Sequence, residues 1–167
     1  MELWDALYKD GTPAGRDLVR GEPVPKGLYH LVCEILVRHT DGTYLMMRRD
    51  LEKEGYPGYW ETTAGGSALK GEDKLACVRR ELREETGILS DTFEEVGRSD
   101  EHDDAIVYSF FCVTDCDKDS IVLQEGETID FRWASEEEFI DFVNSDEMIP
   151  TQRRHLDAWL RKMGYVK

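Results

Sequence analysis

The chain has 167 residues, of which 34% are charged and 40% are hydrophobic, a length and a mixture typical of one folded domain with its own core. Its 36 acidic and 21 basic residues give a formal net charge of −15, and a field of that sign repels nucleic-acid phosphates and anionic lipid heads. The composition therefore excludes a disordered chain and argues against nucleic acid or a membrane surface as a partner.

The cysteines and the apolar runs indicate the cellular compartment of the protein. No apolar run approaches the roughly 18 residues of a membrane-spanning helix, and the first residues lack the pattern of a secretory signal. The cysteines have neither CxxC pairing nor zinc-site spacing, which favours free thiols in a reducing compartment. We therefore expect a cytoplasmic protein with free thiols at Cys33, Cys77, Cys112 and Cys116.

The first 27 residues predict a β-hairpin that extends the main domain. Apolar side chains lie on both sides of the turn signal Asp10-Gly11, and the segment closes with Pro23 and Pro25. We expect a hairpin extension at 1–27 and a single catalytic domain at 28–167. The hairpin could also provide a strand edge for contacts in a homodimer.

The next segments predict a sheet. Alternating apolar residues predict strands over 28–38 and 44–47, joined by a turn at Asp41-Gly42. A charged loop leads to a short strand at 59–63, after which Ala64-Gly65-Gly66 predicts a tight turn. β-branched and aromatic residues predict two further strands at 105–113 and 128–133, and we expect a loop at 96–104.

Helices are expected around this sheet. The first covers 73–86 and ends at Gly87, a residue suited to the left-handed conformation that closes helices. Ser135 to Glu138 form a capping box for the second helix. The third follows Pro150 and is expected to leave His155 on the surface. Helices packed on a mainly β centre indicate an α/β domain. Apolar positions of the third helix are Leu156, Trp159, Leu160 and Met163.

The helix at 73–86 carries the strongest chemical signal. At about 100° per residue, Glu81, Glu84 and Glu85 share one stripe that borders the apolar face. Local stability does not explain this stripe, because the helix dipole disfavours anions near its C-terminal end and Glu81 repels Glu85. A surface helix with salt bridges to neighbouring arginines is one interpretation. The other is a cation site, since clustered carboxylates suit Mg²⁺.

Residues 66–88 resemble the Nudix box, Gly-x5-Glu-x7-Arg-Glu-U-x-Glu-Glu-x-Gly-U, in which U is an aliphatic residue. The chain therefore resembles the Nudix hydrolase superfamily. The resemblance implies a Nudix-like α/β/α sandwich with a mixed β-sheet, to which the N-terminal β-hairpin is added. Every fixed position of the box is filled, by Gly66, Glu72, Arg80, Glu81, Leu82, Glu84, Glu85, Gly87 and Ile88.

The resemblance also implies a function, that of a divalent-metal-dependent pyrophosphohydrolase. Its substrate would be a small-molecule diphosphate, such as a nucleoside diphosphate derivative or a similar organic pyrophosphate, and water would attack phosphorus. Glu81 would help to deprotonate that water, Arg80 would orient Glu81, and Glu72 would brace the loop against the helix. The implied ligands of Mg²⁺ or Mn²⁺ are Glu81, Glu84, Glu85 and the carbonyl oxygen of Gly65.

Residues outside the box are further candidates. Arg48 and Arg49 end a strand near the box and could clamp phosphates with their planar guanidinium groups, although one of them is expected to face solvent. Glu125 and Glu127 could supply an additional metal ligand or base, or could belong to an ordinary acidic turn. His102 could act as a base or simply be solvated.

A wider pattern is similar to the Nudix proteins related to isopentenyl-diphosphate isomerase. Those isomerases use a catalytic cysteine and a metal-binding histidine where this sequence has Gly65 and Ser67, so we favour a hydrolase over an isomerase. A silent ligand-binding module is a third alternative, against which the intact box argues. His30 is then expected to be packed rather than to bind metal. The pattern comprises Trp4-Asp5, Arg20-Gly21-Glu22, Tyr29-His30 and Tyr59-Trp60.

Overall fold

The structure, a computed structural model, describes residues 1–101 and 104–167. The expectation for His102 lies outside these residues. In chain order the elements are β1 (Leu3–Leu7), β2 (Pro13–Val19), β3 (His30–His39), β4 (Tyr44–Arg49), β5 (Trp60–Glu61), β6 (Thr63–Ser67), α1 (Lys74–Thr86), β7 (Glu94–Glu101), β8 (Ala105–Thr114), a 3₁₀ turn (Lys118–Ser120), β9 (Thr128–Ala134), α2 (Glu136–Val143), α3 (Pro150–His155) and α4 (Asp157–Lys162).

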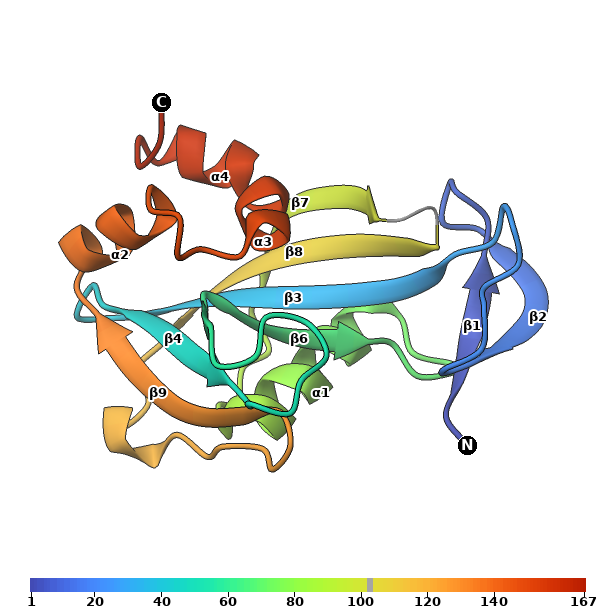
Figure 1. The fold of residues 1–167 in the computed structure, drawn as a ribbon, viewed down its shortest axis with the longest axis horizontal. Helices are drawn as coiled ribbons and strands as arrows, with labels where there is room; N and C mark the ends of the chain where they lie inside the picture. The colour runs from blue at the N-terminus through green and yellow to red at the C-terminus, as the bar shows by residue number, and fades with distance from the viewer. Residues whose placement is uncertain (102–103) are drawn as a thin grey trace.

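A mixed sheet forms the centre of the domain (Figure 1). β3 pairs in parallel with β8, from His30 opposite Ala105 to His39 opposite Thr114, and pairs antiparallel with β6. β4 pairs antiparallel with β5 and β9, and β7 forms the edge beyond β8. The sheet is mixed because β3 and β8 run parallel whereas the other pairs are antiparallel. A parallel pair requires a crossover connection, which the chain makes between β3 and β8.

Helices cover both faces of this sheet, α1 on one and α2, α3 and α4 on the other (Figure 1). Successive side chains of a strand point to opposite faces, so Ile35 joins the core beneath α1 with Leu82, whereas Leu36 joins the core beneath the other helices with Phe139 and Leu160. The α/β/α sandwich predicted from the sequence is therefore confirmed.

The N-terminal hairpin is also confirmed, because β1 and β2 form a separate two-stranded antiparallel sheet. Trp4 and Leu18 belong to its own small core, and a bridge from Leu7 to Tyr29 joins it to the start of β3. Trp4 stacks on His30 with 4.1 Å between ring centroids, and burial lowers the pKa of this imidazole. His30 is packed, as the sequence predicts.

Two segments that the sequence predicted as a turn and a loop are strands. Ala64, Gly65 and Gly66 form part of β6 rather than a tight turn. Glycine is needed there for close approach, since a Cβ atom on Gly65 would lie 2.1 Å from the carbonyl oxygen of Cys33. Most of the segment predicted as a loop at 96–104 belongs to β7, a polar strand at the edge of the sheet.

The C-terminal helix also differs from the prediction. It is broken at Leu156 into α3 and α4, and Met163 is 39% exposed rather than in the core. Within the described residues no helix is long and apolar enough to cross a membrane. The cysteines carry free thiols, buried in every case except the half-buried Cys116.

Helix α1 begins and ends where its capping residues predict. The side chain of Asp73 accepts a hydrogen bond from the backbone nitrogen of Ala76 at 2.8 Å. Gly87, at φ 77°, closes the helix by donating from its backbone nitrogen to the carbonyl of Arg83. These two residues fix the length of the helix that carries the box glutamates.

We expect Asp73→Ala to lower the free energy of unfolding by about 1 kcal/mol, because it removes the N-cap acceptor. Urea denaturation would measure the change. Asp91→Ala is the matched control, since this exposed carboxylate pairs with Arg79 at the surface and such pairs contribute about 0–1 kcal/mol. Equal stability of Asp73→Ala and the parent chain would contradict the capping role.

Candidate active site

The box residues meet where β6 lies against α1. Glu81 and Glu85 are buried and Glu84 is exposed. The backbone nitrogen of Gly65 donates to Glu85 Oε2 at 3.0 Å, and a Cβ atom on Gly66 would lie 2.7 Å from Glu81 Oε1. Gly66 therefore leaves room for the Glu81 carboxylate beside the strand, and the Gly65 backbone binds Glu85.

Arg80 organises the polar side of this helix. Its Nη1 donates to Glu81 Oε1 at 2.7 Å and to Glu84 Oε2 at 3.0 Å, while Nη2 donates to the carbonyl of Ser67 at 3.0 Å. Its Nε and Nη2 hold both oxygens of Glu72 at 2.8 and 2.9 Å, which lowers the pKa of that carboxyl. The arginine thus ties the incoming loop to Glu81, the contacts that the box resemblance implies.

Glu85 is the least compensated charge of the group. Burial raises the pKa of its carboxyl well above the usual value, and the neighbouring carboxylates Glu61 and Glu81 raise it further. Within the described residues its hydrogen-bond partner is the Gly65 amide rather than a cation. A buried carboxylate beside others of like charge is costly unless a positive charge offsets it.

Sequence reasoning missed Glu61. This buried residue of β5 accepts from Arg49 Nη1 at 3.2 Å and from Gln152 Nε2 at 3.0 Å. Burial raises the pKa of its carboxyl although Arg49 acts in the opposite direction. The available signal was a glutamate inside a strand of aromatic and threonine residues, Tyr59 to Thr63.

A cavity of about 240 Å³ opens over the box carboxylates. It shares several lining residues with an adjoining cavity of about 170 Å³ that reaches Glu34 and Glu61. Besides the box and its glycines, the charged residues that line the first cavity are Glu2, Arg20, Lys53 and Glu127.

The structure separates the paired candidates outside the box. Arg49 lines the inner cavity, whereas Arg48 lines neither cavity and donates from Nε to the carbonyl of Gly58 at 3.1 Å. Glu127 lines both cavities and pairs with Lys53, whereas Glu125 is exposed and lines neither. One member of each pair is therefore brought to the site.

The sequence predicted His155 on the surface, but the structure buries its side chain. Its side chain is 7% exposed, and Nδ1 lies 3.1 Å from Glu34 Oε1, which also accepts from Ser109 Oγ at 2.6 Å. The difference arises because α3 packs against β7 rather than standing clear of the sheet. Glu34 thereby holds a fixed position at the wall of the inner cavity.

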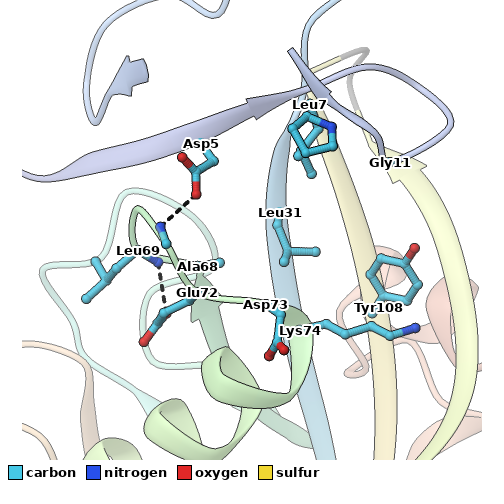
Figure 2. A pocket seen from close by; sticks show the side chains of 12 residues that line it. Asp5, Leu7, Gly11, Leu31, Ala68, Leu69, Glu72, Asp73, Lys74 and Tyr108 are labelled. Atoms are coloured by element: carbon cyan, nitrogen blue, oxygen red, sulfur yellow. Dashed lines mark hydrogen bonds between the residues drawn. The ribbon is translucent and has the colours of Figure 1, made fainter. Parts of the chain in front are cut away.

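A larger cavity of about 540 Å³ lies between the hairpin and the start of α1 (Figure 2). Its walls include Leu7, Leu31 and Tyr108, and Lys74 lies 4.4 Å from the Tyr108 ring centroid. None of the three glutamates of the stripe lines it. The glutamates of the stripe therefore line the smaller, charged cavity and not this one.

The carboxylates fit a hard divalent cation in the kind of donor they offer. Within the described residues no three His, Cys, Asp or Glu side chains converge closely enough to ligate one ion. The donors are nevertheless all oxygens, as Mg²⁺ and Mn²⁺ prefer. A cation beside Glu85 would also offset the repulsion that raises the pKa of its carboxyl.

Comparison with known proteins identifies the family. Residues 28–160 match the NUDIX domain, and the chain belongs to this family. It is 34% identical over 151 residues to an uncharacterised Nudix hydrolase of Listeria monocytogenes, lmo0368, covering 90% of this chain and 89% of that one. It is 31% identical over 138 residues to the uncharacterised Nudix hydrolase YfcD of Escherichia coli, with 81% and 74% covered.

Solved structures agree on the fold. The DR0079 protein of Deinococcus radiodurans gives a TM-score of 0.74 at 16% identity, covering 95% of this chain and 99% of that one. The NUDIX domain of Shewanella oneidensis NrtR, solved with ADP ribose, gives 0.60 at 14% identity, with 83% and 89% covered. Family membership makes the chain a Nudix pyrophosphohydrolase. The similarity to the isomerase subgroup stays a prediction.

In metal-free buffer we expect Glu85→Gln to be more stable than the parent chain at pH 8, by an amount that shrinks toward pH 5. A carboxyl whose pKa is raised in the folded state stabilises that state at low pH, and this contribution is lost as the pH rises through the folded-state pKa. Glutamine keeps an oxygen to accept from Gly65.

Thermal unfolding in a chelating buffer would measure this difference. Glu137→Gln, at an exposed position of α2, controls for the loss of one charge and is expected to melt with the parent chain. A Glu85→Gln protein that is less stable than the parent at every pH would contradict the repulsion inferred here.

Proposed function

We propose that this chain is a divalent-metal-dependent hydrolase that cleaves the diphosphate linkage of a nucleoside diphosphate derivative or a similar organic pyrophosphate. Water would attack phosphorus. The observation that carries the proposal is that Glu81, Glu84 and Glu85 line one cavity and that Glu85 is buried there beside other carboxylates. A cavity built in this way suits cations and the phosphates they accompany.

Glu81, Glu84 and Glu85, together with the carbonyl oxygen of Gly65, would hold Mg²⁺ or Mn²⁺. When bound, such an ion offsets phosphate charge and lowers the pKa of a coordinated water. The Gly65 amide fixes one oxygen of Glu85 and leaves the other for a ligand. Arg80 in the same way fixes Oε1 of Glu81.

Two residues are candidates for the base that takes a proton from the attacking water. Glu81 is buried, which raises the pKa of its carboxyl despite Arg80, and a raised pKa suits a base working near neutral pH. Glu127 lies on a separate loop, lines both cavities and is held by Lys53. Arg49, on the wall of the inner cavity, is the candidate for phosphate binding.

The isomerase alternative is disfavoured by geometry at Gly65. Gly65 stands where those isomerases are expected to have their catalytic cysteine. A Cβ atom at Gly65 would lie 2.1 Å from the carbonyl oxygen of Cys33, so no side chain fits there. A hydrolase needs only the backbone of this residue.

With Mg²⁺ or Mn²⁺, we expect phosphate or pyrophosphate release from one class in a panel of nucleotide, dinucleotide, sugar-nucleotide and prenyl diphosphates. Glu85→Gln is expected to lower kcat at least about 100-fold, because an ion site would supply several kcal/mol of charge stabilisation. Glu137→Gln controls for surface charge.

The outcomes of this panel separate the alternatives. Release that survives chelation or is unchanged in Glu85→Gln would contradict a metal-dependent hydrolase. Interconversion of prenyl diphosphate isomers without phosphate release would favour an isomerase, and ligand-induced stabilisation without turnover would favour a binding module.

We expect Glu127→Gln to lower kcat by roughly 100-fold or more, in the range of general-base catalysis, and Glu125→Gln to leave it unchanged. The two residues lie in the same turn, but only Glu127 lines the cavities. Steady-state kinetics on the substrate found by the panel would compare them. Equal kcat values for the two variants would assign the base to Glu81 instead.

A further inference from the structure

Arg20 reaches the mouth of the carboxylate cavity from the N-terminal hairpin. It follows β2 and lines the cavity together with Arg80 and Glu84. Its Nη1 binds a carboxylate oxygen of Glu2 at 3.1 Å, and its side chain is 60% exposed. Within the described residues Nε and Nη2 donate to no partner. The guanidinium group therefore has unused donors at the entrance of an active site.

The hairpin is held in a fixed position relative to α1. Asp5 accepts from the backbone nitrogen of Gly71 at 2.6 Å, a contact that Figure 2 shows. The backbone nitrogen of Lys70 donates to the carbonyl of Leu3 at 2.9 Å, and Nζ of the same lysine pairs with Asp17 at 2.7 Å. These bonds tie the hairpin to the loop that leads into α1.

That loop is also part of the active site. Glu72, which holds Arg80, accepts from the backbone nitrogen of Leu69 at 2.9 Å (Figure 2). Leu69 itself lines the carboxylate cavity. The position of Arg20 is therefore coupled to the carboxylates through a chain of hydrogen bonds rather than through a flexible linker.

The charges that line the cavity favour a cation at its mouth. Five glutamates line it, in a protein whose formal net charge is −15, and a diphosphate would be repelled by that field. Among the described lining residues the cations are Arg20, Lys53 and Arg80. Arg80 is engaged by glutamates of the box and Lys53 by Glu127.

We propose that Arg20 is a substrate-binding residue that holds the phosphate group of the diphosphate lying farther from the box carboxylates. This inference rests on the proposed function. A planar guanidinium binds two phosphate oxygens at once. In the structure the Glu2 carboxylate occupies the position proposed for this phosphate. It accepts from Arg20 and, at 3.0 Å, from the indole nitrogen of Trp4. When the diphosphate binds, its phosphate replaces the Glu2 carboxylate on Arg20.

The test measures binding of inorganic pyrophosphate by calorimetry in the presence of Mg²⁺. Arg20→Gln is expected to weaken binding at least about 10-fold, in line with the loss of charge-assisted hydrogen bonds. Arg20→Lys keeps the positive charge but not the planar guanidinium group. Its affinity is expected to lie between those of Arg20→Gln and the parent chain. Glu2→Gln is expected to tighten binding, because it removes the competing carboxylate.

Arg16→Gln is the matched control, since Arg16 is exposed on β2 of the same hairpin and lines neither the carboxylate cavity nor the adjoining one. It is expected to change affinity less than about twofold. Arg20→Gln, Arg20→Lys and Arg16→Gln are each expected to melt within about 2 °C of the parent chain, because the ion pair of Arg20 and the side chain of Arg16 are both exposed and add little stability. Equal affinities of Arg20→Gln and Arg16→Gln would overturn the proposal, as would a parent chain that fails to bind pyrophosphate.

Kinetics distinguish this proposal from the proposed function. On the substrate found by the panel, Arg20→Gln is expected to raise KM about 10-fold with little change in kcat, as expected for a residue that binds the ground and transition states equally. Metal-dependent turnover with pyrophosphate binding that does not depend on Arg20 would overturn only the role of Arg20. Binding that depends on Arg20, without metal-dependent turnover, would support that role and overturn the hydrolase.

Discussion

The close approach of β6 to its two neighbours is the constraint on which the rest of the site depends. On one side Gly65 lies against the backbone of Cys33 in β3, and on the other Gly66 lies against the carboxylate of Glu81. A side chain at Gly65 would push the strand away from β3, and one at Gly66 would displace the Glu81 carboxylate. Because the strand is close, its Gly65 amide can bind Glu85, and the carboxylates stay beside the backbone carbonyl that the family resemblance assigns to the ion.

This arrangement works against the stability of the protein without a ligand. Glu61, Glu81 and Glu85 all have carboxyl pKa values raised by burial, and each adds to the repulsion in the group. Arg49 offsets part of this repulsion at Glu61, and Arg80 offsets part of it at Glu81. A fold selected only for stability would replace Glu85 with an apolar residue, so the buried carboxylate supports the cation site that we propose there.

The parts that the sequence could predict are those determined by local rules. The ends of α1 follow from Asp73 and Gly87, and the hairpin follows from its turn residues and apolar pattern. The glycines of β6 were misinterpreted, because a glycine needed for a turn and one needed for close approach look the same in a sequence. Glu61 and His155 were misjudged for a related reason, since each depends on a partner that is distant in sequence: Glu61 on Gln152 of α3, and His155 on Glu34 of β3.

The proposed role of Arg20 would explain how an acidic protein can bind an acidic substrate. Net charge acts over a Debye length of about 8 Å in physiological salt, so the groups nearest the entrance decide whether a phosphate enters. β1 and β2 lie outside the residues that match the NUDIX domain, yet they place Arg20 at that entrance. A separate hairpin can change without disturbing the packing between β6 and α1. With Arg20 in the proposed role, the hairpin is a part of the chain in which substrate selection can vary while the packing between β6 and α1 stays constant.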